Sequence, residues 1–189
     1  MTREADHLAA LIGSRMCHDL VSPLGAIGNG VELMQMMQPP SPEMDLVSEA
    51  VKMAQDRIRL FRLAFGVADD AQTVHAADLV AALCALEGNG RLRVQPDLSG
   101  TMPRAAARRL ALAALCAESA LAWGGDIAVT PTGLSARAHR LRLDPDLWPL
   151  LAQGAAPKEP SSATVHFALL AYSGPVTAQY SETALTITL

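Results

Sequence analysis

Apolar residues in the first third of the chain recur every three or four positions and predict two long helices. The first is predicted over residues 4–38 and ends at the proline-rich run 39–42, because proline lacks the amide hydrogen and disfavours helix in the residue before it. Ser41 is a suitable cap for a second helix that has Pro42 in its first turn and continues to Gly66. So short a connector predicts an antiparallel hairpin.

A hairpin of two amphipathic helices cannot bury all of its apolar surface by itself. Pairing with a second copy completes a four-helix bundle, which is the common way for such hairpins to cover that surface. We therefore expect the chain to form a homodimer through its N-terminal helices.

After the Asp69-Asp70 dipeptide the pattern changes to short elements. Helices are predicted at residues 76–86, 103–123, 144–153 and 161–172, and strands at 91–95, 127–130, 135–143, 176–180 and 184–189. The expected fold class is α+β, with a helical-hairpin domain over residues 1–68 and an α/β sandwich domain over residues 73–189.

Composition limits the kinds of partner. Hydrophobic residues make up 50% of the chain and aromatic residues 4%, which suits helices packed through small aliphatic side chains. A net charge of -4 disfavours nucleic acid and anionic membranes as partners. The chain has no apolar run of about 18 residues and no signal-peptide pattern at its start, so we expect a cytoplasmic protein. Three widely spaced cysteines predict neither a disulfide framework nor a zinc site.

His18 is the candidate reactive residue. With about 100° of rotation per residue, it points away from the side expected to form the core, while Ser22, Gly25 and Asn29 lie within about 40° of it. The expected core side consists of Met16, Leu20, Ile27, Val31 and Met34. An exposed neutral imidazole presents a ring nitrogen that can accept a phosphoryl group from an aspartyl phosphate.

The neighbours of His18 are unusual for the interior of a helix. Asp19 either orients or deprotonates the imidazole ring, or is a solvated carboxylate, and the sequence leaves both interpretations open. Pro23 removes one backbone hydrogen bond. Gly25, Gly28 and Gly30 each disfavour helix by about 1 kcal/mol relative to alanine, and close approach of another surface, such as a docked partner, would explain them.

These residues form a motif. The segment His18-Asp19-Leu20-Val21-Ser22-Pro23-Leu24-Gly25-Ala26-Ile27 resembles the H-box of sensor histidine kinases. With the segments 15–20 and 29–33, the chain more narrowly resembles the ChpT-type histidine phosphotransferases of bacterial phosphorelays. That resemblance implies a dimer with a hairpin like the kinase dimerisation domain, followed by a degenerate relative of the kinase ATP-binding domain.

The resemblance also implies roles for individual residues. His18 corresponds to the phosphoacceptor, with Asp19 and Ser22 as its catalytic neighbours. The candidates for binding a receiver domain are Arg15, Ala26, Asn29 and Glu32. The implied function is to relay a phosphoryl group between the receiver domain of a hybrid histidine kinase and the aspartate of a response regulator. The chain is expected to bind no cofactor or metal, with Mg²⁺ carried by the receiver partner.

The motifs of an active kinase are missing from the sequence. The chain has only two asparagines, Asn29 and Asn89, and neither lies in the helix predicted at 103–123, where Glu118 is the nearest substitute for the Mg²⁺-binding asparagine. It also has no Asp-x-Gly-x-Gly segment for adenine. We therefore do not expect ATP binding or hydrolysis. Two alternatives stay open, namely a divergent ATP-dependent histidine kinase and a non-catalytic scaffold that binds receivers.

Overall fold

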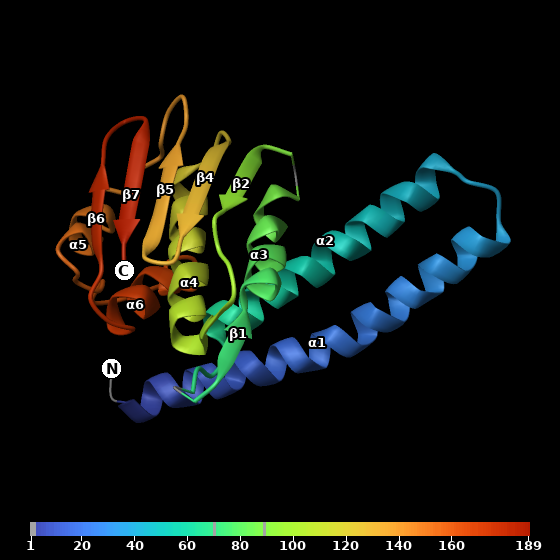
Figure 1. Cartoon of the computed structure of the whole chain (residues 1–189), viewed down its shortest axis with the longest axis horizontal. Helices are drawn as coiled ribbons and strands as arrows, with labels where there is room; N and C mark the ends of the chain where they lie inside the picture. Colours follow the sequence, from blue (N-terminus) through green and yellow to red (C-terminus); the bar gives the residue numbers. More distant parts are fainter. Residues whose placement is uncertain (1–2, 70, 89) are drawn as a thin grey trace. The chain divides into compact units, whose positions relative to one another are not determined.

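A computed structural model describes residues 3–69, 71–88 and 90–189, and side chains from residue 8 onward (Figure 1). The chain divides into two compact units, Met1–Val67 and Ala68–Leu189. The predicted α+β class is confirmed, with long helices at the N-terminus and a mixed sheet with helices after them. Asp70 and Asn89 lie outside the described residues.

The first unit is the predicted hairpin, formed by α1 (Arg3–Met37) and α2 (Pro42–Phe65). Pro23 lies inside α1, and the helix continues beyond it. The Ser41 hydroxyl caps α2 by accepting a hydrogen bond from the Met44 amide at 3.2 Å. Helix start and stop signals in the sequence therefore placed both helices to within one or two residues.

In the single chain, only part of the predicted core side of the first helix is buried. Val31 is buried as expected, but the other four residues of that set are exposed in the single chain: Met16, Leu20, Ile27 and Met34. The buried side of α1 instead carries the small residues Ala10 and Cys17. At Gly13 a Cβ would lie 2.8 Å from the Phe65 carbonyl oxygen of α2, so the two backbones approach closely there. The side predicted from hydrophobic periodicity therefore shares only Val31 with the side of α1 that is buried in the single chain.

The second unit contains a five-stranded sheet in the order β2-β4-β5-β7-β6. Strand β2 is parallel to β4, and the other neighbouring pairs are antiparallel. The strands are β2 (Leu92–Pro96), β4 (Gly125–Thr130), β5 (Gly133–Arg137), β6 (Thr177–Tyr180) and β7 (Ala184–Thr188). Two short strands, β1 (Thr73–His75) and β3 (Thr101–Pro103), form a separate antiparallel pair.

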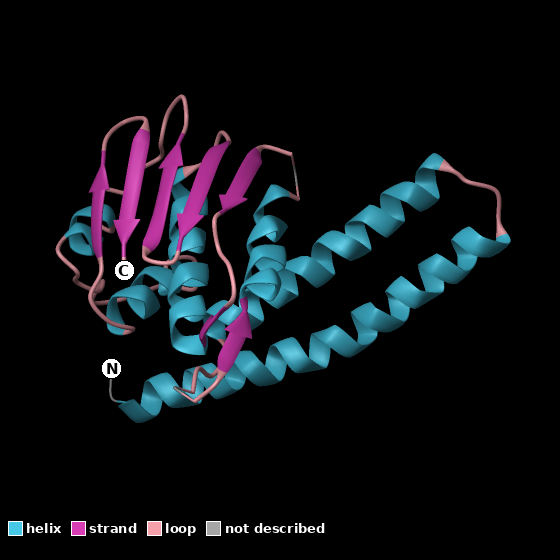
Figure 2. Cartoon of the chain, viewed as in Figure 1, coloured by secondary structure: helices cyan, strands magenta, loops and turns pink. Residues whose placement is uncertain are grey.

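Helices cover one side of this sheet (Figure 2). They are α3 (Ala76–Cys84), which a 3₁₀ turn over Ala85–Glu87 extends, α4 (Arg104–Ala120), α5 (Trp148–Ala152) and α6 (Val165–Tyr172). Helix α4 packs against β4, β5 and α6, and its buried residues are mostly alanine and leucine. Trp148 fills the core next to Phe167, with ring centroids 5.2 Å apart. None of the helices in the described ranges is both long and apolar enough to cross a bilayer.

Some predicted boundaries were wrong for physical reasons. The strand predicted at 135–143 ends at Arg137, because the next backbone amides bond elsewhere: those of Ala138 and Leu141 donate to carbonyls at Thr183 and Glu182. The helix predicted at 144–153 begins later, since the Asp144 carboxylate accepts from two backbone amides in a turn that precedes it. Strands β1 and β3 were not predicted, because three residues are too few to show alternation.

The turn between β4 and β5 depends on a glycine. Gly133 has φ +152°, and a Cβ there would overlap the carbonyl oxygen of Ile187 on β7. We expect Gly133→Ala to lower the free energy of unfolding by at least about 2 kcal/mol, because it adds overlap to an unfavourable backbone conformation. Urea unfolding followed by tryptophan fluorescence measures this, since both tryptophans, Trp123 and Trp148, belong to the second unit.

Gly90→Ala is the matched control. Gly90 has φ +68° but no atom within 4 Å of the Cβ position, so this variant should lose only about 1 kcal/mol from the left-handed conformation. Equal losses in the two variants would contradict the role of the overlap with Ile187.

Candidate functional site

His18 projects from the middle of α1 into solvent. Its side chain is 81% exposed, and its Nδ1 lies 3.4 Å from Oδ1 of Asp19. When Nδ1 carries the proton and donates a hydrogen bond to the carboxylate, the lone pair is on Nε2. The arrangement therefore suits a nucleophilic imidazole that is accessible to a large partner.

Asp19 is held between two cationic or hydrogen-bonding groups. Its other carboxylate oxygen, Oδ2, accepts a hydrogen bond from Nε of Arg15 at 2.9 Å, one helical turn away. Desolvation acts to raise the pKa of Asp19, but the hydrogen bonds from His18 and Arg15, together with their charges, outweigh it and lower the pKa. Asp19 therefore stays ionised at neutral pH and can accept a hydrogen bond from Nδ1–H of His18.

The structure brings three of the predicted site residues together, in the series Arg15, Asp19 and His18. The other predicted residues are all exposed on α1: Ser22, Ala26, Asn29 and Glu32. Within the described hydrogen bonds, none joins Ser22 to His18. Ser22 thus lies one turn from the imidazole, while its predicted catalytic role stays a prediction.

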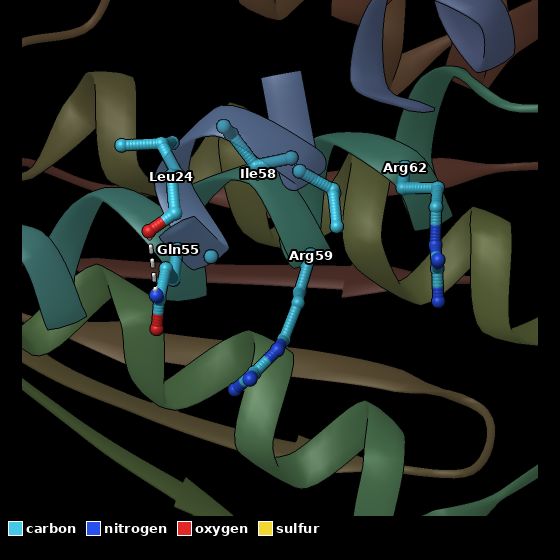
Figure 3. Close-up of a pocket in the computed structure, with 7 residues that line it drawn as sticks. Leu24, Gln55, Ile58, Arg59 and Arg62 are labelled. Carbon is cyan, nitrogen blue, oxygen red and sulfur yellow. Dashed lines mark hydrogen bonds between the residues drawn. The ribbon is translucent and has the colours of Figure 1, made fainter. Parts of the chain in front are cut away.

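A pocket of about 200 Å³ lies on the hairpin next to this surface (Figure 3). We call it the hairpin pocket. It is lined by Val21, Leu24 and Gly25 of α1 and by Gln55, Ile58, Arg59 and Arg62 of α2. Sequence reasoning concentrated on α1 and missed the contribution of α2. The available signal was the spacing of positions 55, 58, 59 and 62, which places them on one side of a helix.

A positively charged side chain of α2 acts on the residue that precedes His18. Cys17, the residue before His18, is a buried free thiol. Burial raises the pKa of this thiol, and the positive charge of Arg62 acts in the opposite direction. Arg59, on the preceding turn of α2, makes an ion pair with Asp56 at 2.8 Å. A raised pKa disfavours the thiolate, so Cys17 is interpreted as a packed residue of the hairpin.

The site shows no arrangement for holding a metal ion. Among the described residues, no three His, Cys, Asp or Glu side chains gather closely enough to bind one. What α1 offers is one exposed imidazole oriented by a carboxylate, next to a pocket with two arginines in its lining. Such a site can take up an anionic group that another molecule delivers.

Comparisons with known proteins identify the family of the chain. Residues 75–174 match the family "Histidine phosphotransferase C-terminal domain". Protein phosphotransferase ChpT of Brucella abortus (strain 2308) is 31% identical over 175 residues, which are 86% of this chain and 82% of that protein.

A solved structure described as "1.7 Angstrom Structure of a Bacterial Phosphotransferase" shares the fold. It matches with a TM-score of 0.63 and 24% identity, over 100% of this chain and 98% of the other. The family match covers more than half of the chain, and the Brucella relative spans both compact units. The chain belongs to the ChpT-type histidine phosphotransferase family.

Proposed function

We propose that His18 is the phosphoacceptor and that the chain relays a phosphoryl group from the receiver domain of a hybrid histidine kinase to the aspartate of a response regulator. The observation that carries this proposal is the 81% exposed imidazole of His18, with Nδ1 against the Asp19 carboxylate. An oriented and accessible ring nitrogen is what transfer between two proteins requires, because phosphoryl transfer depends mostly on positioning and charge.

The proposed step is a direct displacement at phosphorus. The lone pair of His18 Nε2 attacks the phosphoryl group of an aspartyl phosphate, the bond from phosphorus to the aspartate oxygen breaks, and the carboxylate leaves. The imidazole then carries positive charge, which the ionised Asp19 stabilises through Nδ1. The reverse step loads the next receiver. The Mg²⁺ that neutralises the phosphoryl oxygens belongs, in this proposal, to the receiver, and this chain binds no cofactor of its own.

Receiver binding is assigned to the exposed side of α1 around His18. Arg15, Ala26, Asn29 and Glu32 are all exposed there, and Ser22 lies between them in the sequence. Arg15 has a second role in this proposal, because its bond to Asp19 keeps that carboxylate in place.

A homodimer is part of the proposal. Large apolar side chains remain exposed along both helices of the hairpin, including Met16, Leu20, Ile27 and Met34 on α1 and Leu46 and Met53 on α2. On α1 their spacing of four and seven residues places them on one side of the helix, as in bundles of four helices. A second copy of the hairpin supplies a matching apolar surface, and it leaves the His18 side of α1 free.

We also propose a cytoplasmic location. Cys17 and Cys116 are reduced thiols, which is the usual state in a reducing compartment.

Replacement of His18 tests the central proposal. We expect His18→Ala to abolish transfer of radiolabel from a phosphorylated receiver, because no other group replaces the Nε2 nucleophile. Labelling is measured by autoradiography after incubation with the receiver and Mg²⁺. His139→Ala is the matched control, since it removes another exposed histidine and should label like the unaltered protein.

The same assay separates the alternatives. Label retained by His18→Ala would contradict the proposal. Label taken from ATP alone would support a divergent kinase, and a receiver complex that forms without any phosphohistidine would support a scaffold.

The negative charge of Asp19 should speed the phosphorylation of His18. We expect Asp19→Asn to slow loading of His18 by about 10²-fold, because the neutral amide stabilises the charged imidazole less well. The rate is measured by rapid quench at saturating phosphorylated receiver. Asp45→Asn removes an exposed carboxylate in the first turn of α2 and should leave the rate unchanged. An unchanged rate in Asp19→Asn would show that Asp19 is only a solvated carboxylate.

The oligomeric state has its own test. Ile27→Glu places a charge among the exposed apolar residues of α1, so we expect it to convert a dimer to a monomer in sedimentation equilibrium. Leu33→Glu, an exposed leucine on another side of α1, should leave the dimer intact. A monomeric unaltered protein would contradict the proposed bundle.

A further inference from the structure

A hydrogen bond inside the hairpin pocket connects α2 to the backbone of α1. Gln55 of α2 donates from Nε2 to the carbonyl oxygen of Leu24 at 3.1 Å (Figure 3). Leu24 lies six residues after His18, and both bonding partners line the hairpin pocket. The bond therefore ties the two helices together within two turns of the imidazole.

Gly28 provides the space for this bond. A Cβ at Gly28 would lie 2.7 Å from Nε2 of Gln55, so a side chain there would force the amide away from Leu24. At Gly30, two residues on, no atom lies within 4 Å of the Cβ position. The sequence analysis attributed these glycines to the approach of another surface, and at Gly28 that surface is the Gln55 side chain.

We propose that Gln55 is a positioning residue: its bond to Leu24 sets the register of α2 along α1 and thereby holds Arg59 and Arg62 at the correct level for a receiver docked at His18. This inference rests on the proposed function of His18. It gives Gln55 of α2 a part in the transfer reaction, which Gln55 exerts through the placement of Arg59 and Arg62.

Apolar contacts alone do not fix this register well. Val51 reaches within 3.6 Å of the Gly28 Cβ position, and Ile58 lines the pocket, but contacts of this kind have no direction and tolerate sliding. A polar side chain with one partner between two helices does specify their register, and Gln55 is such a residue, partly buried against Leu24. A slide by one residue moves α2 by about 1.5 Å along its axis, and misplacement of about 1 Å can slow a transfer reaction considerably.

The register of α2 matters because it sets where the positive charges of Arg59 and Arg62 lie relative to His18. Arg62 lines the hairpin pocket together with Val21 and Leu24, which follow His18 by three and six residues on α1. Arg59 lines the same pocket and is partly neutralised by Asp56. A receiver that carries an aspartyl phosphate presents negative charge to this surface, and correctly placed guanidinium groups favour its approach.

Two variants remove the same bond by different routes. Gln55→Met keeps the length of the side chain but lacks a donor, and Gly28→Ala displaces the Gln55 amide without changing it. We expect each to lower kcat/KM for transfer from a phosphorylated receiver by about tenfold, measured at sub-saturating receiver. Labelling by phosphoramidate, a small donor that needs no docking, should stay unchanged. The double variant should be no slower than the slower single variant, because both changes act on one bond.

Gly30→Ala is the matched control, since it makes the same substitution on the same helix where the Cβ meets open space. It should transfer at the rate of the unaltered protein. Helicity and melting temperature are recorded for every variant by circular dichroism. If Gln55→Met does not fold, Gly28→Ala still tests the bond, because alanine favours helix over glycine.

The outcomes are distinguishable. Receiver-dependent rates that equal those of the unaltered protein in both variants would overturn this inference and leave the role of His18 intact. An equal loss of phosphoramidate labelling would also overturn it, because the bond would then support the imidazole itself rather than docking. Failure of the unaltered protein to accept a phosphoryl group from any receiver would overturn the proposed function and this inference with it.

Discussion

The close packing of α1 against α2 is the constraint on which the candidate site depends. Small residues make it possible, since Cβ atoms at Gly13 and Gly28 would lie 2.8 and 2.7 Å from atoms of α2. This packing uses one side of α1 for the hairpin. A second side carries exposed apolar residues, and His18 lies on a third, polar side. Three different sides of α1 thus serve the packing against α2, the proposed dimer contact and the chemistry of His18.

The chemistry on the polar side is simple because its parts are local. Arg15, Asp19 and His18 follow one another within one turn of α1 and need no other element to meet. What α2 adds is the other wall of the hairpin pocket, with Gln55 and two arginines in its lining. The second unit is built differently, around α4 and the buried side of the sheet, with Trp148 and Phe167 in its core. That unit includes the matched family domain.

The hairpin was largely predictable, because prolines, a serine cap and a period of three to four residues are local signals. Ser41 and Gly66 bound α2 as expected. The strands of the second unit were less predictable. Strand β5 ends early because amides at Ala138 and Leu141 bond to a distant segment, and β1 and β3 are too short to be recognised before they pair. Hydrophobic periodicity did not identify Ala10 as a buried position of α1, because a small side chain contributes little to an apolar pattern.

The sequence by itself determined that His18 lies on a polar side of a long helix with Asp19 next to it, and that both belong to an H-box-like motif. These properties depend only on helical rotation and on neighbouring residues. Only the tertiary structure decided which apolar side of α1 packs in the hairpin, and which residues of α2 complete the pocket. The Gln55 bond to Leu24 joins positions 31 residues apart. Such a contact exists only once the chain has turned back on itself, so no local pattern could reveal it.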